Sequence, residues 1–87
     1  MNDIINFKDG LAEALSVALW LAKRTPLRLW HRLPGWIDLR IRGLVTLARE
    51  QAKVDGLLAG LAFAVDCVRR LRGLRACEEL SAAISTL

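Results

Sequence analysis

Residues 44–68 decide the fold, and they read LVTLAREQAKVDGLLAGLAFAVDCV. Large aliphatic side chains recur there at alternating three- and four-residue steps, which places them along one edge of a helix. A repeat of about 3.5 residues predicts a helix that packs lengthwise against another helix. We name the eight positions of this repeat the predicted seam: Leu44, Leu47, Gln51, Val54, Leu58, Leu61, Val65 and Val68.

The helix that carries the predicted seam is expected to cover residues 36–72. Unbroken, it would be about 55 Å long, which is long for a compact chain of 87 residues. A homodimer would support such a helix along its whole length, and we therefore predict one. Two readings of Gly56 and Gly60 stay open. They could break the helix, or they could let a second backbone approach closely.

Three further segments complete the expected organisation. A helix over residues 9–24 would begin with Asp9 as its N-cap, and its scarcity of polar positions predicts burial on more than one side. The two prolines bound a connector or short helix over residues 25–35. A short helix is expected over residues 76–87. The sequence thus predicts a single all-α domain, residues 1–87, with three to four helices in a hairpin or bundle.

Charge is distributed unevenly along the chain. Thirteen Lys and Arg residues against nine Asp and Glu residues give a net charge of +4. Residues 23–42 contain six basic residues and only one acid, Asp38. A second basic cluster, without an acid, could contact nucleic acid electrostatically: Arg69, Arg70, Arg72 and Arg75.

Tryptophan and arginine alternate in and after the proline-bounded connector. These are the residue types that most often carry binding energy at protein interfaces. We therefore predict that a protein partner contacts five residues: Arg28, Trp30, Arg32, Trp36 and Arg40. The alternative is that Trp30 and Trp36 fill the ends of the core.

The sequence offers little material for catalysis. His31 is the only histidine and the two cysteines, Cys67 and Cys77, are ten residues apart, a spacing that fits no usual metal site. No phosphate-binding glycine loop or paired carboxylates occur. We therefore expect no enzyme activity, no metal and no cofactor, with both cysteines as free thiols in a reducing cytoplasm. The longest uncharged stretch, residues 56–65, has ten residues, so we expect no transmembrane segment.

These observations favour a small helical protein-binding module that acts as an inhibitor, adaptor or regulator of a larger protein. The Arg- and Ala-rich composition is typical of a bacterial, phage or mobile-element gene. Electrostatic binding of DNA or RNA is the alternative. A second alternative is peripheral membrane association through residues 26–42, where arginine, leucine and tryptophan mix as in interfacial helices.

Overall fold

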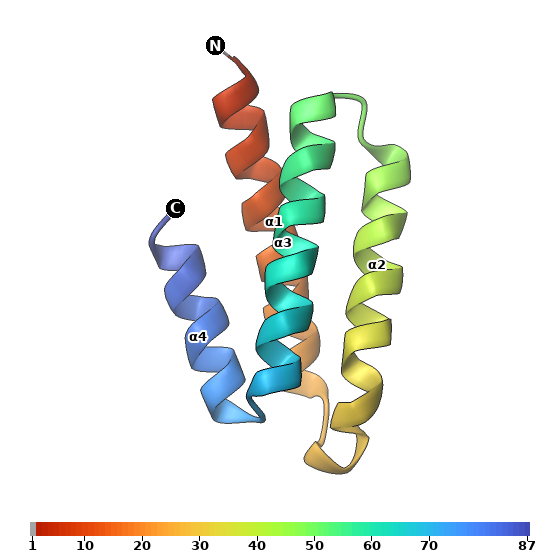
Figure 1. The fold of residues 1–87 in the computed structure, drawn as a ribbon, viewed down its shortest axis with the longest axis vertical. Coiled ribbons are helices and arrows are strands. Elements are labelled where there is room, and N and C mark those ends of the chain that lie inside the picture. Colours follow the sequence, from red (N-terminus) through yellow and green to blue (C-terminus); the bar gives the residue numbers. More distant parts are fainter. Residues whose placement is uncertain (1) are drawn as a thin grey trace.

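The computed structural model of the chain describes residues 2–87, which form a helical bundle (Figure 1). A short 3-10 helix, η1 (Leu27–Arg32), lies between the first two of four α-helices: α1 (Asn2–Arg24), α2 (Leu33–Leu47), α3 (Gln51–Arg70) and α4 (Leu74–Ser85). Within residues 2–87 there is no strand. The predicted all-α bundle of three to four helices is confirmed.

Helices α1 and α3 form the centre of the bundle and run in the same direction. Figure 1 shows α2 on one side of this pair and α4 on the other, both antiparallel to it. The register follows from the glycines. Gly10 of α1 faces Lys53 and Leu57, whereas Gly56 of α3 faces Phe7 and Leu11. Residue numbers therefore rise together along both helices.

The two central helices touch through their backbones. A Cβ atom added to Gly56 would overlap the carbonyl oxygen of Phe7 and lie 2.9 Å from the amide nitrogen of Leu11. One added to Gly60 would lie 2.6 Å from the Cβ of Ala14. Gly10 is enclosed in the same way by Lys53 and Leu57. Small residues recur at every fourth position on both facing sides, which permits this close approach.

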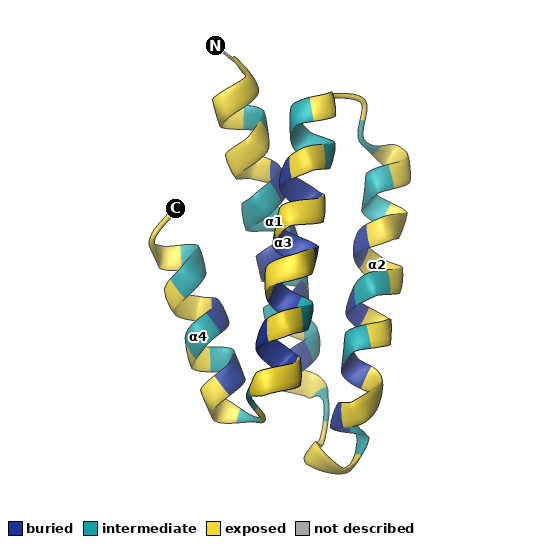
Figure 2. Ribbon diagram, viewed as in Figure 1, coloured by how far each residue is buried: buried dark blue, intermediate teal, exposed yellow. Residues whose placement is uncertain are grey.

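The core extends along both sides of this pair (Figure 2). Helix α2 contributes Leu33, Ile37 and Ile41, which are fully buried. Helix α4 contributes Ala76 and Leu80. The buried side of α3 is the side that carries its two glycines, not the whole of the predicted seam. Its buried residues are Gly56, Leu57, Gly60, Leu61, Ala64, Cys67 and Val68.

Trp30 fixes η1 to the end of α3. Its side chain is 3% exposed, and its indole nitrogen donates hydrogen bonds to the carbonyl oxygens of Val68 at 2.8 Å and Leu71 at 3.1 Å. These carbonyl groups lie at the end of α3, where the helix has no further N–H groups to bond them. Gly73, in the turn that follows, has a φ of 58°, a conformation that glycine adopts without strain.

The predicted long helix over residues 36–72 is wrong. Ala48 and Glu50 are extended, with ψ angles of 135° and 127°, so the chain reverses between α2 and α3. The greatest dimension of the molecule is 42 Å, shorter than the rod that the sequence predicted. Reversal lets α3 bury its glycine face against α1, which a single rod could not do.

Within one chain the predicted seam is not one continuous buried edge, because it is divided between α2 and α3. Only Leu61 and Val68 are buried, while Leu44, Val54 and Val65 are partly buried. Leu47, Gln51 and Leu58 are exposed. The heptad pattern counted large aliphatic residues, but the side of α3 that faces α1 is built from small ones. Of the two readings of Gly56 and Gly60, close backbone approach is confirmed and helix breakage is not.

Three boundaries differ from expectation. Helix α1 begins at Asn2, so Asp9 lies inside it rather than at its N-cap. Thr25 ends α1 instead of starting a helix, since its hydroxyl donates to the carbonyl oxygen of Leu21 at 2.7 Å. Pro34 lies in the first turn of α2, where its missing N–H costs no helical hydrogen bond. The last helix begins at Leu74, close to the predicted position.

We predict that Gly56→Ala lowers the free energy of unfolding by at least about 2 kcal/mol, because the added methyl group forces α1 and α3 apart. Urea denaturation followed by circular dichroism measures this change. The matched control is Gly43→Ala in α2, where an added Cβ meets no atom within 4 Å. Higher helix propensity should make the control more stable by up to about 1 kcal/mol. Equal effects at both positions would contradict the close approach.

We further predict that Trp30→Phe lowers the free energy of unfolding by about 1–3 kcal/mol, because two carbonyl oxygens at the end of α3 lose their donor. Trp36→Phe, in an exposed position on α2, is the control and should change stability by less than about 0.5 kcal/mol. Thermal unfolding of both variants tests the difference. Similar melting temperatures for the two variants would argue against the role given to the Trp30 indole.

Candidate functional site

A groove between α1 and α2 combines apolar and basic side chains. Ser16, Val17 and Trp20 of α1 and Arg40 and Leu44 of α2 line it, and its volume is about 420 Å³. We name it the Trp20 groove. It exists because α1 packs far more closely on α3 than on α2. Side chains rather than backbones therefore bridge the space between α1 and α2.

Trp20 is the largest side chain of this groove, and 48% of its surface is exposed. The guanidinium carbon of Arg24, one turn further along α1, lies 4.0 Å from the centroid of the Trp20 ring. Arg24 also donates a hydrogen bond to the Trp20 carbonyl oxygen at 3.3 Å. The cation–π contact and the hydrogen bond together hold the ring in place while leaving half of it open to a partner.

Two arginines give the Trp20 groove a positive charge. Within residues 2–87, the carboxylates that form ion pairs do so with Arg42, Lys53 and Arg70, and neither Arg24 nor Arg40 has a carboxylate partner. A guanidinium without a partner can donate several hydrogen bonds to an incoming carboxylate. The groove can thus accept an apolar side chain together with a neighbouring acidic one.

The five predicted partner contacts separate in the structure. Arg40 lines the Trp20 groove, and Trp36 lies one helical turn before it on the same exposed side of α2. Arg28 and Arg32 are exposed on η1, at the end of the bundle. The prediction for Trp30 is wrong, because its indole is buried and holds the core closed, as the alternative reading had it.

Trp20 is not among the partner contacts that the sequence predicted. The helix expected over residues 9–24 has few polar positions, which predicted burial on several sides. Helix α1 instead leaves this ring exposed, because the small residues Ala14, Ala18 and Ala22 take the buried side. The spacing of Trp20 and Arg24, four residues apart on one helix, was the available signal.

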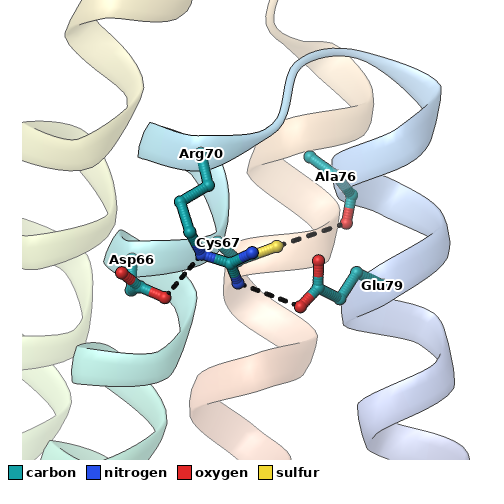
Figure 3. Close-up of polar contacts among 5 residues, drawn as sticks. All are labelled: Asp66, Cys67, Arg70, Ala76 and Glu79. Atoms are coloured by element: carbon teal, nitrogen blue, oxygen red, sulfur yellow. Dashed lines mark hydrogen bonds and ion pairs between the residues drawn. The ribbon is translucent and has the colours of Figure 1, made fainter.

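The four predicted nucleic-acid contacts are not equivalent. Arg69, Arg72 and Arg75 are exposed around the turn between α3 and α4. Arg70 is held between two carboxylates (Figure 3): its Nε donates to Asp66 at 2.8 Å and its Nη2 donates to Glu79 at 3.0 Å. These hydrogen bonds, that of Asp66 first, raise the pKa of Arg70 above its ordinary value. Arg70 therefore links α3 to α4.

The cysteines lie on different helices, Cys67 on α3 and Cys77 on α4, and both are free thiols. The Sγ of Cys67 lies 3.7 Å from the carbonyl oxygen of Ala76 (Figure 3). Burial, together with the negative charge of Glu79, raises the pKa of Cys67 to about 11. Burial also raises the pKa of Cys77. Neither thiol is activated for nucleophilic chemistry.

A second groove lies at the other end of the bundle, between the beginnings of α1 and α3. Its volume is about 670 Å³. Its apolar surface comes from Ile4, Phe7, Leu11 and Leu87, and acids outnumber bases on its rim: Asp3, Glu50 and Asp55 against Lys8. Its charge is therefore opposite to that of the Trp20 groove.

No protein-family model, curated protein or solved structure matches this chain. None of the helices in the described part of the chain is long and apolar enough to cross a membrane. Residues 2–87 contain no group of three or more His, Cys, Asp or Glu side chains placed to hold a metal ion.

We predict that Cys67 of the folded protein does not react with a disulfide reagent at pH 8, because its pKa of about 11 leaves almost no thiolate. Cys77, which is less buried, should react slowly. In guanidinium chloride the chain is unfolded, and both thiols should react rapidly. As pH rises from about 9 to about 11, the unfolded thiol loses its proton before the folded one, so Cys67 lowers stability over that range. Fast modification of Cys67 in the folded state would refute its burial.

Proposed function

We propose that the chain is a non-enzymatic protein-binding module and that the Trp20 groove is its contact surface. In this proposal it acts as an inhibitor, adaptor or regulator by occupying a segment of a larger protein. The partner segment is an amphipathic helix that places an apolar side chain against Trp20 and Leu44 and an acidic side chain beside Arg40. Helix-in-groove binding of this kind is a common mode of peptide recognition.

The half-open Trp20 ring, flanked by Arg24 and Arg40, is the observation that carries this proposal. Tryptophan and arginine are the residues over-represented among interface hot spots. Here Trp20 and Arg40 line an apolar groove and Arg24 lies over the Trp20 ring, and neither arginine has a carboxylate partner within residues 2–87. Charge complementarity therefore selects an acidic partner segment.

The predicted homodimer stays a proposal with a weaker basis. The sequence favours a dimer because it predicts a long unbroken helix, but that helix is divided into α2 and α3, and α3 packs on α1, α2 and α4 of its own chain. Light scattering coupled to size-exclusion chromatography measures the oligomeric state directly. A cytoplasmic location also stays a proposal, supported by two cysteines that form no disulfide and so fit a reducing compartment.

We predict that Trp20→Ala and Arg40→Glu each weaken partner binding at least about tenfold, the size of effect expected of an interface hot spot. The partner is first isolated with the wild-type chain and purified, and its affinity for each variant is then measured by calorimetry. The matched control is Phe63→Ala on α3, since Phe63 is similarly exposed, at 39%, and lies outside the groove.

Nuclear magnetic resonance gives a second readout for the same proposal. The chain has three tryptophans, so three indole N–H signals are expected. Addition of the purified partner should shift the Trp20 signal and leave that of Trp30 unchanged, because Trp30 is buried. A partner that binds both groove variants as well as the wild type, without moving the Trp20 signal, would refute the proposed surface.

A further inference from the structure

The end of the bundle that carries η1 and the turn between α3 and α4 concentrates positive charge. The second basic cluster of the sequence meets the first four basic residues of the 23–42 range there, because α1 and α3 end and α2 and α4 begin at this end (Figure 1). We name it the basic tip. Its acids are Asp66, Glu78 and Glu79, two of which are bound to Arg70. Its bases are Lys23, Arg24, Arg28, Arg32, Arg69, Arg70, Arg72 and Arg75.

Two leucines project from the basic tip. Leu27, the first residue of η1, is 61% exposed, and Leu74, the first residue of α4, is 73% exposed. They belong to neighbouring segments, since a Cβ added to Gly73 would lie 3.3 Å from the Cδ2 of Leu27. The tip therefore exposes two aliphatic side chains on segments that also carry the exposed Arg28, Arg72 and Arg75.

The backbone that presents these leucines is fixed rather than free. Trp30, three residues after Leu27, donates to the carbonyl oxygens of Val68 and Leu71 and so ties η1 to α3. Gly73 turns the chain into α4 with its positive φ. The backbone on both sides of the turn is therefore fixed, and both leucine side chains are exposed from fixed positions.

We propose that the basic tip binds the surface of an anionic lipid bilayer. Leu27 and Leu74 enter the boundary between headgroups and acyl chains, and the surrounding arginines pair with lipid phosphates. Apolar residues inserted at the interface and basic residues attracted to anionic lipid act together in peripheral membrane binding. The tip shares one residue, Arg24, with the surroundings of the Trp20 ring, and the proposal does not depend on the function proposed for the Trp20 groove.

The two exposed leucines favour a bilayer over nucleic acid as the occupant. A nucleic-acid backbone offers nothing to cover Leu27 and Leu74, whereas the acyl boundary of a membrane does. Trp30, the tryptophan of η1, is buried at 3% exposure and bonded through its indole, so its ring is not available to stack on a base.

The test is co-sedimentation of the 87-residue chain with phosphatidylcholine vesicles, with and without phosphatidylserine. We expect binding to the vesicles that contain phosphatidylserine to be at least about tenfold tighter and to weaken as salt is raised. The variant L27S/L74S should lose at least about tenfold in affinity for them. Circular dichroism checks that it stays folded, as expected for exposed side chains.

The matched control is L39S/L47S, which removes two leucines of α2 that are 75% and 78% exposed but lie away from the tip. It should bind vesicles as the wild type does, and so should Trp20→Ala, which separates this proposal from that of the Trp20 groove. Absence of binding to anionic vesicles would overturn the proposal, as would equal losses in L27S/L74S and L39S/L47S. Tighter binding to DNA or RNA than to vesicles would overturn it in favour of nucleic acid.

Discussion

Helices α1 and α3 touch through their backbones at Gly10, Gly56 and Gly60, and the bundle is arranged around that contact. Each glycine inside a helix costs about 1 kcal/mol of helix propensity relative to alanine. Close packing of two helices over several turns offsets this cost, because many backbone and methyl atoms reach contact distance. The contact also joins segments that lie far apart in the sequence, since α1 and α3 are separated by η1 and α2.

The surfaces of the molecule follow from this arrangement. Since α1 is drawn toward α3, its other side meets α2 only through side chains, and Trp20 and Arg40 are left over an open groove. The parallel central pair also brings the ends of α1 and α3 to the same end of the bundle. Arginines that are distant in sequence are thereby collected at one tip, together with Leu27 and Leu74.

The helical class, the last helix and the end of α1 at Arg24 could all be predicted from composition, helix periodicity and the position of Gly73. The break between α2 and α3 could not. Ala48, Arg49 and Glu50 are all residues that favour helices or tolerate them, with no proline or glycine among them. The reversal there is a tertiary effect, because the burial of the glycine face against α1 outweighs local helix propensity.

The candidate site was predictable only in part. Arginine and tryptophan content drew attention to α2, where the structure leaves Trp36 and Arg40 exposed. The sequence could not show that Trp30 points inward, since that depends on carbonyl groups of α3 that lie 38 and 41 residues away. The exposure of Trp20 had only one signal in the sequence, its spacing from Arg24, because which side of α1 is buried depends on the glycines of α3.

The most direct test of the close approach between α1 and α3 is the pattern of nuclear Overhauser effects at two glycines. The structure predicts contacts from the Hα protons of Gly56 to residues 7 and 11, and from those of Gly60 to the methyl group of Ala14. The nuclear Overhauser effects between residues three and four apart, which mark a helix, should be interrupted at residues 48–50. Unbroken helical contacts from residue 36 to residue 72, with none between these glycines and α1, would contradict the account.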